Sequence, residues 1–190
     1  MIPVAAYHNT CISWEPNMAT DKVSFMKLEL RPSKDITTPP PPIVPFADWD
    51  YYYTTQPLGW RANTPVEGMP ASVTVPTGFV TDLASIPAIF WSILPPGARY
   101  SYPAIIHDYL YWFQPCERAQ ADAVFKAAME DMRVPAAKIA VIYNAVHLAG
   151  KTAWDNNTTL REAGEKRVLK IYPTNALTSW TIWKSQDVFT

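Results

Sequence analysis

The chain has 190 residues, of which 48% are hydrophobic and 17% are charged. This length and composition allow one buried core, so we expect a single domain and not two. The formal net charge of −1 excludes a strongly basic surface of the kind that grips nucleic acid or anionic lipid.

Prolines and aromatic residues are the unusual part of the composition. Nineteen Pro against six Gly predict long, stiff, irregular connections between the elements. The eight Trp, ten Tyr and seven Phe can fill a core, contact other proteins or line a sugar-binding surface. Two cysteines, Cys11 and Cys116, lack the spacing of a zinc site, and we favour two free thiols over a bridge between them.

The sequence predicts neither a secretory signal nor a transmembrane helix. The N-terminus has no charged segment followed by an apolar run, so we expect no secretory signal. No stretch approaches the roughly 18 apolar residues of a transmembrane helix. We therefore expect a soluble protein that is synthesised in the cytoplasm of its host.

The first part of the chain predicts irregular β structure. Residues 22–30 predict a strand with a bulge at Met26, where the alternation of apolar and polar residues slips. The prolines at 39–42 predict an extended polyproline segment, for which we favour a surface spacer over a docking motif. The aromatic-rich stretch Asp48–Trp60 predicts more β structure, and Ala71–Val75 alternates as a short strand.

A turn, a strand and a short helix are predicted next. Thr77–Gly78 forms the turn, and Phe79–Thr81 continues as a strand. Ser85 is a suitable cap for a helix that ends near Leu94, because two prolines follow that residue.

Three longer helices are predicted in the second half. They run over Pro103–Phe113, Glu117–Met132 and Pro135–Trp154, and prolines separate them. Val168–Tyr172 resembles a strand, whereas Trp180–Trp183 fits an edge strand or a docking tail. The expected fold class is α+β, with an N-terminal β-rich half and long irregular connections packed on a C-terminal three-helix core.

The second of these helices places a carboxylate on its apolar face. Asp122 belongs to a stripe with helical spacing that also contains Arg118, Phe125, Met129 and Met132. A buried carboxylate costs several kcal/mol unless it is paired or hydrogen-bonded. We therefore expect Asp122 to have a partner on a neighbouring element.

The preceding helix offers His107, which also lies among apolar residues. A short link between the two helices would bring His107 and Asp122 face to face. An imidazole held by a buried carboxylate keeps one tautomer and becomes a better base. Asp108 lies about 100° further round the same helix and can face a neighbouring pocket that holds an oxygen-ligated cation.

Two alternatives remain open for the acidic residues. Asp82 follows a strand in a loop, where it either completes a cation site with Asp108 or holds the start of the helix at Ser85. A His107–Asp122 pair between helices is either a reactive dyad or a satisfied structural bridge. The spacing of the residues is compatible with both alternatives for Asp82 and with both for the His107–Asp122 pair.

Three short motifs occur in order between residues 78 and 125: GF-x-TD-x-ASIP, HD-x-LY and R-x-x-AD-x-x-F. In this order they resemble a family of unknown function from tailed bacteriophages and prophages. The resemblance covers about residues 70–150. It implies that the extensions, residues 1–69 and 155–190, serve in assembly.

The pair His107–Asp108 with Tyr111, followed by Asp122, also resembles the catalytic helices of small calcium-dependent phospholipases of the A-two type. This resemblance implies that His107 activates water, Asp108 binds calcium and Asp122 orients the histidine. The same resemblance implies that Tyr111 belongs to the site. The chain departs from that pattern because it has no glycine-rich calcium loop and no flanking cysteines, so Asp82 and its loop would have to replace them.

These resemblances set the functional expectations. We expect a bacteriophage virion or tail-associated protein that carries a hydrolase-like site formed by His107, Asp122 and Tyr111. Asp108 and Asp82 are the candidate ligands for a cation, and calcium is the cation that the phospholipase resemblance implies. The expected partners are other virion proteins in an oligomeric assembly, without nucleic acid, and the candidate substrates are envelope lipid and peptidoglycan. The alternatives are a purely structural assembly protein and a calcium-dependent lipid ester hydrolase.

Overall fold

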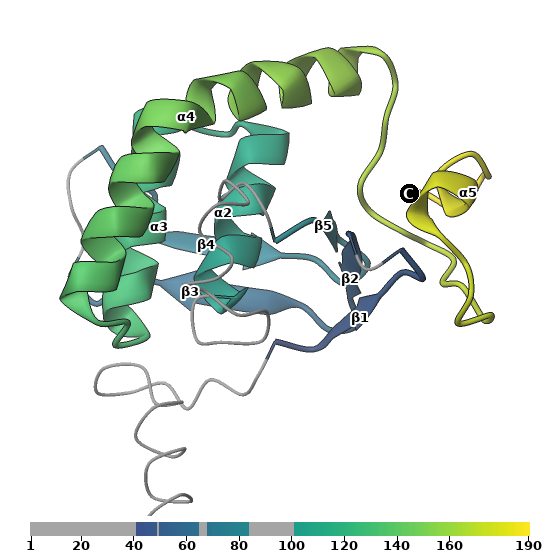
Figure 1. Cartoon of the computed structure of the whole chain (residues 1–190), viewed down its shortest axis with the longest axis horizontal. Helices are drawn as coiled ribbons and strands as arrows, with labels where there is room; N and C mark the ends of the chain where they lie inside the picture. Colours follow the sequence, from purple (N-terminus) through teal and green to yellow (C-terminus); the bar gives the residue numbers. More distant parts are fainter. Residues whose placement is uncertain (1–40, 49, 65–67, 84–100) are drawn as a thin grey trace, which may run out of the picture.

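The computed structural model describes residues 41–48, 50–64, 68–83 and 101–190 (Figure 1). Short strands come first and helices follow, so the expected α+β class is confirmed. The strands are β1 (Ile43–Pro45), β2 (Tyr52–Thr54), β3 (Leu58–Arg61), β4 (Ser72–Val75) and β5 (Val80–Thr81). The helices are α2 (Ser101–Phe113), α3 (Arg118–Asp131), α4 (Ala136–Glu162) and α5 (Trp180–Trp183).

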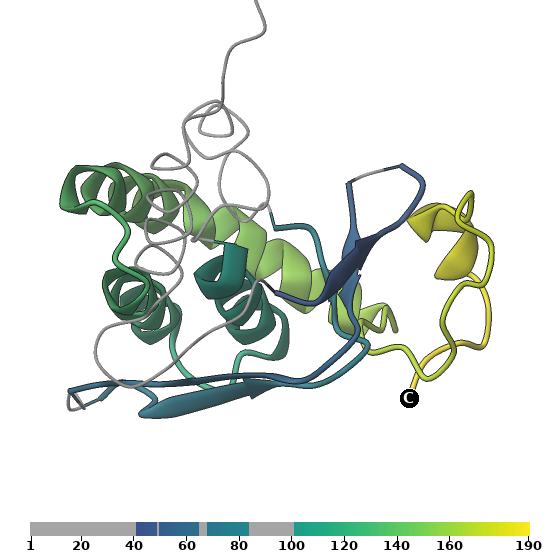
Figure 2. The ribbon, with the colours of Figure 1, turned by 90° about the horizontal axis from the view of Figure 1, so that it is seen from below.

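The strands form two small antiparallel sheets. One has the order β1-β2-β5, with Val44 opposite Tyr53 and Tyr53 opposite Val80. The other is the hairpin of β3 and β4, which lies on one side of the helices in Figure 2. Burial alternates along both hairpin strands, as expected for a sheet with one face on a core. Trp60 and Val75 are therefore among the residues that face the core.

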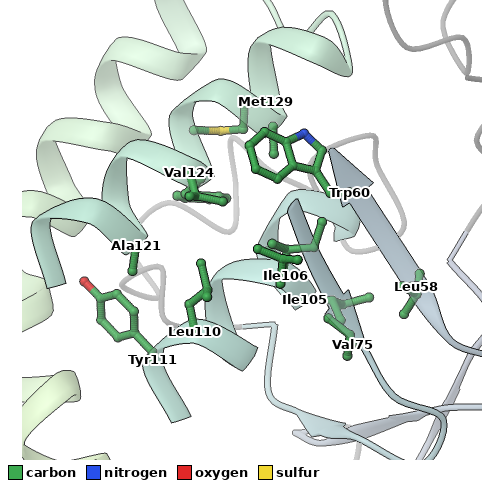
Figure 3. Packing of buried hydrophobic residues seen from close by; sticks show 14 of the residues in the cluster. Leu58, Trp60, Val75, Ile105, Ile106, Leu110, Tyr111, Ala121, Val124 and Met129 are labelled. Carbon is green, nitrogen blue, oxygen red and sulfur yellow. The ribbon is translucent and has the colours of Figure 1, made fainter. Parts of the chain in front are cut away.

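The main core lies between this hairpin and helices α2 and α3 (Figure 3). Helix α2 contacts α3, α4, β4 and β5, and ten of its 13 residues are buried. Such a central helix is apolar on nearly all sides, which explains its run of aliphatic and aromatic residues. Ile105, Ile106, Leu110, Val124 and Met129 form the middle of the core.

A second core joins the two ends of the described chain. Phe46 and Tyr53 pack there with Leu169, Trp180 and Phe189, which come from the C-terminal segment. The segment is attached to β5 through backbone hydrogen bonds from the Val80 amide to the Arg167 carbonyl oxygen (2.7 Å) and from the Leu169 amide to the Gly78 carbonyl oxygen (2.9 Å). Gly78 has a φ of 83°, and a Cβ at this position would overlap the Leu169 backbone.

The side chain of Arg167 lies between the two cores. Its guanidinium carbon is 4.6 Å from the ring centre of Trp112, 5.2 Å from that of Tyr51 and 5.8 Å from that of Trp180. The guanidinium also pairs with Glu165 at 2.9 Å. Cation–π contacts in a buried setting are stronger than exposed ones, so Arg167 ties the C-terminal segment to α2.

Most predicted elements agree with the structure, but α4 is longer than predicted. The sequence predicts that this helix ends near Trp154, but the helix continues to Glu162 through Asn and Thr residues, which favour helices only weakly. Tertiary contacts outweigh these weak propensities. Thr158 donates to Gln114 (2.8 Å), and Arg161 donates to Gln114 (2.8 Å) and to the backbone carbonyl of Trp112.

The C-terminal expectations need two corrections. Residues 168–172 do not form a strand. Val168 pairs with Phe79 and Leu169 pairs with Phe189, each in an isolated antiparallel bridge. Trp180–Trp183 is a short helix and not an edge strand, since Ser179 caps it by accepting from the Ile182 amide. The buried Trp180 makes this helix part of the second core.

Several expectations concern residues outside the described ranges. These are the strand at 22–30, the first two prolines of 39–42, the helix from Ser85 to Leu94, and Cys11. Cys116 is described and has a free thiol. None of the helices within the described ranges is long and apolar enough to cross a membrane.

Candidate functional site

The expected pairing of the two helices is present in the structure. The Nε2 atom of His107 lies 3.1 Å from Oδ1 of Asp122, and the two side chains are 1% and 0% exposed. The His107 ring packs on Phe125, with 4.6 Å between the ring centres, and on Tyr111 at 4.0 Å. These contacts from α2 and α3 fix the orientation of the imidazole.

Asp122 is the centre of a larger polar cluster that the sequence only partly predicts. The Tyr111 hydroxyl donates to Oδ1 at 2.6 Å, and Arg118 donates to Oδ2 at 2.9 Å. His147, on α4, places Nδ1 3.4 Å from Oδ2. Three helices therefore meet at one carboxylate. We refer to Asp122 and its four neighbours, His107, Tyr111, Arg118 and His147, as the Asp122 cluster.

The charges within the cluster follow from burial and hydrogen bonding. Burial would raise the pKa of Asp122, but hydrogen bonds from His107 and Tyr111 and the charge of Arg118 outweigh it, so this pKa is lowered. Burial lowers the pKa of His107 despite the opposing effect of Asp122. At neutral pH the cluster therefore contains an ionised carboxylate, balanced by Arg118, and a neutral imidazole.

The tautomer of His107 follows from these protonation states. An ionised carboxylate can only accept hydrogen bonds, so the proton of the neutral imidazole lies on Nε2, which donates to Asp122. Nδ1 is then the basic nitrogen. Burial, followed by the hydrogen bond to Asp122, raises the pKa of Tyr111, which keeps its hydroxyl protonated as a second donor.

Gly150 makes room for this arrangement. A Cβ at position 150 of α4 would overlap the hydroxyl of Tyr111 and approach Arg118 to 3.4 Å. A side chain at this position would therefore displace the donor that Tyr111 offers to Asp122. The requirement for glycine comes from contact between helices, because Gly150 lies inside α4 and not at a turn.

We expect Gly150→Ala to destabilise the protein even though alanine favours helices. The overlap with Tyr111 should cost about 1–3 kcal/mol. The higher helix propensity of alanine offsets about 1 kcal/mol of this cost. Urea unfolding measures the difference in stability between Gly150→Ala and the wild type. The control is the same substitution in Tyr111→Phe, because that protein lacks the hydroxyl that the added Cβ would overlap. A Gly150→Ala protein that is more stable than the wild type would contradict this geometry.

Asp108 points to a different part of the structure. Its Oδ2 accepts a hydrogen bond from the hydroxyl of Thr81, at the end of β5. The same hydroxyl accepts from the Leu83 amide at 3.1 Å. Leu83 has a φ of 53°, which is rare for a residue with a branched side chain. Asp82 lies between these residues, and its charge raises the pKa of His107 as a minor contribution.

The predicted cation ligands thus lie on neighbouring segments. Within the described ranges, no group of three or more His, Cys, Asp or Glu side chains is placed to hold a metal ion. Asp108 and Asp82 would therefore need backbone or water oxygens to complete a coordination shell.

Sequence reasoning missed two contacts of Asp122. Arg118 lies four residues before Asp122 on the same helix, and this spacing indicates an ion pair, so a signal was available. His147 is 25 residues away on a different helix, and nothing in its local sequence indicates the contact. The side chain of His147 is 48% exposed and lies at the rim of the cluster.

Part of the chain matches the model of a known family. Residues 59–146 match the model of a family described as a protein of unknown function, DUF1353. The match includes His107, Tyr111, Arg118 and Asp122, and it ends one residue before His147. No curated protein and no solved structure matches the chain.

Proposed function

We propose that the chain is a bacteriophage virion or tail-associated protein that carries a hydrolase site with His107 as its general base. The observation that carries the proposal is the hydrogen bond of 3.1 Å between Nε2 of His107 and the ionised carboxylate of Asp122. It leaves Nδ1 as the basic nitrogen of a neutral imidazole. Support for the phage setting comes from the three motifs of residues 78–125.

The chemistry follows from this protonation state. Nδ1 of His107 takes a proton from water, and the water oxygen attacks the carbonyl carbon of an ester or amide. The imidazolium is stabilised by Asp122, which stays ionised. The tetrahedral intermediate then collapses, and the imidazolium returns the proton to the leaving oxygen or nitrogen. Asp122 positions the ring in this scheme and does not take up the proton itself.

The cost of burying the charges of the Asp122 cluster supports a functional role for it. A buried ion pair is often no more stable than apolar side chains of similar size, so it contributes little to the stability of a core by itself. Helix α2 carries a second buried carboxylate, Asp108, which is 6% exposed and accepts from Thr81 of β5. The loop that contacts Asp108 contains Leu83 in a strained conformation, and strain of this kind gathers at functional sites.

The substrate class is an ester or amide of the bacterial envelope, either lipid or peptidoglycan. The lipid option rests on the similarity of His107, Asp108, Tyr111 and Asp122 to the catalytic helices of A-two type phospholipases. The hydrogen bond from Tyr111 to Asp122 (2.6 Å) supports that similarity, since it links the aromatic residue four positions after the histidine to the same carboxylate. In this option Asp108 and Asp82 supply oxygen ligands to calcium.

A structural clamp without catalysis is the second candidate, and burial favours it. His107 is 1% exposed and Asp108 is 6% exposed. Two pockets among the described residues, with volumes of about 340 and 620 Å³, are lined by neither of these side chains. In this reading the Asp122 cluster holds α2, α3 and α4 together in a virion component that has no enzymatic activity.

Hydrolysis assays separate the two candidates. Wild-type protein and His107→Gln are incubated with labelled phospholipid vesicles and with labelled peptidoglycan, each with calcium and with a chelator. The proposal expects wild-type hydrolysis of one substrate and its loss in His107→Gln. A chelator effect would support a calcium site at Asp108. Equal rates for the two proteins, or no hydrolysis by folded wild-type protein, would leave the clamp as the function of the cluster.

A further inference from the structure

The Asp122 cluster comes closest to solvent where α3 packs beside α4 (Figure 1). His107, Tyr111 and Asp122 are at most 1% exposed. Arg118 of α3 is 24% exposed and His147 of α4 is 48% exposed. Exposure within the cluster therefore rises toward the face that α3 and α4 share, and a ligand of the cluster would approach from this face.

Two contacts show that the seam between α3 and α4 continues beyond the cluster. Asp122 of α3 lies beside His147 of α4. One turn later on α3, the ammonium of Lys126 lies 5.6 Å from the ring centre of Tyr143, which is one turn earlier on α4. The Tyr143 ring is stacked on the His147 ring, with 5.7 Å between the centres and 15° between the planes. Tyr143 is therefore the link between the cluster and the next part of the seam.

A groove of about 620 Å³ opens in that next part, and both Lys126 and Tyr143 line it. This volume lies in the usual range of small-molecule sites. The apolar part of its lining comes from Val134 and Ile139 and from two short side chains, Ala136 and Ala140. The groove therefore has room for small apolar groups, such as methyl groups, beside its polar side chains.

The groove also contains two opposite charges, Lys126 and Glu130. Their side chains are 50% and 56% exposed, and the 4.0 Å from Nζ to Oε1 is longer than a hydrogen bond. An exposed pair of this kind contributes little to stability. The ammonium can therefore donate to a carboxylate of a ligand, and the carboxylate can accept from an ammonium of a ligand. The groove is complementary to a zwitterion.

Two components of the bacterial envelope present such a zwitterion. The peptide stem of peptidoglycan carries free carboxylates, an amino group on its diamino acid and the methyl groups of its alanines. The phosphatidylethanolamine headgroup carries a phosphate and an ammonium, followed by long acyl chains. Acyl chains in this groove would remove Lys126 and Glu130 from water without pairing them, which is costly. The short lining at Ala136 and Ala140 instead matches the methyl groups of the peptide.

We infer that the groove between α3 and α4 binds the peptide stem of peptidoglycan, with Lys126 on a carboxylate and Glu130 on the ammonium of the peptide. Tyr143 holds the bound peptide beside the Asp122 cluster. Binding in the groove does not require catalysis. Only the use of the bound peptide as a substrate rests on the proposed function.

Isothermal titration calorimetry of the full chain with a synthetic stem peptide, acetyl-L-alanyl-γ-D-glutamyl-L-lysyl-D-alanine, tests the site. The wild type should bind one peptide per chain. Lys126→Met should weaken binding by about tenfold or more, as expected for loss of a hydrogen bond between charged groups. The matched control is Lys151→Met, because Lys151 also pairs with an acidic residue one turn later, Asp155, but lies outside the groove. This control should bind like the wild type.

A second peptide, in which the lysine amino group is acetylated, tests the contact of Glu130. The wild type should bind it about tenfold more weakly than the first peptide, because the acetylated group has no charge. Glu130→Gln should bind the two peptides equally, since this protein lacks the carboxylate that distinguishes them.

Several results would overturn the inference. They are a folded wild type that binds neither peptide, Lys126→Met with wild-type affinity, and a loss of binding in Lys151→Met as large as that in Lys126→Met. Flotation with phosphatidylethanolamine vesicles examines the lipid source, and vesicle binding that Lys126→Met abolishes would assign the groove to a headgroup instead. A peptide that binds as expected but is not hydrolysed would uphold the groove and count against the proposed function alone.

Discussion

Replacement of Asp122 by alanine should lower the free energy of unfolding by about 3–5 kcal/mol. The carboxylate accepts from His107, Tyr111 and Arg118 and also faces His147, so its removal leaves several polar groups on three helices without their partner. Loss of one partner from a buried ionic network costs far more than loss of an exposed pair. For a domain of this size the change corresponds to a fall in melting temperature of roughly 6–20 °C.

Asp155→Ala is the matched control for this prediction. Asp155 is also an aspartate in an ion pair, with Lys151 at 2.5 Å, but both side chains are more than half exposed. Exposed pairs contribute only about 0–1 kcal/mol, so this variant should melt close to the wild type. Thermal unfolding followed by circular dichroism compares the two proteins. A similar shift in both would mean that the Asp122 cluster does not hold the helices together.

His107→Gln should reduce the rate of hydrolysis by about 10²–10⁴-fold, the usual contribution of a general base. Burial lowers the pKa of His107, so its neutral, basic form should persist at lower pH than that of an exposed histidine. The rate of the wild type should therefore rise with pH and reach its plateau below the ordinary titration range of histidine, near pH 6.5.

The pH dependence of kcat/KM on the substrate that the wild type hydrolyses checks this prediction. His147→Gln is the control, because His147 is 48% exposed and contacts Asp122 without contacting His107 through any described bond. The kcat/KM of the His147→Gln variant should still rise with pH as that of the wild type does. A wild-type rate that reaches its plateau only above pH 6.5, or a His107→Gln protein with the wild-type profile, would contradict the assignment of a buried His107 as the base.

The sequence contains enough information to predict the pairing at the centre of the site. A carboxylate on an apolar helix face requires a partner, and the adjacent helix offers His107 among apolar residues. Proline positions likewise predicted the starts of the three helices to within two residues. These features are local, because they depend on spacing within a helix and on the loss of a backbone donor at proline.

The rest of the arrangement depends on contacts between distant residues. The length of α4 follows from hydrogen bonds of Thr158 and Arg161 with the end of α2, which no local pattern reveals. The role of Gly150 depends on where the Tyr111 hydroxyl lies. Trp180–Trp183 has the composition of a strand, but the cap from Ser179 and the burial of Trp180 favour a helical turn.

The second core has a consequence for the order of folding. It unites Phe46 and Tyr53 with Trp180 and Phe189, which are more than 120 residues away along the chain. Contacts over such separations form slowly, because a long loop must close first. The helices between residues 101 and 162 have nearer partners, so they should assemble earlier. The second core would then be the last part to close and the first to open in local fluctuations of the native protein.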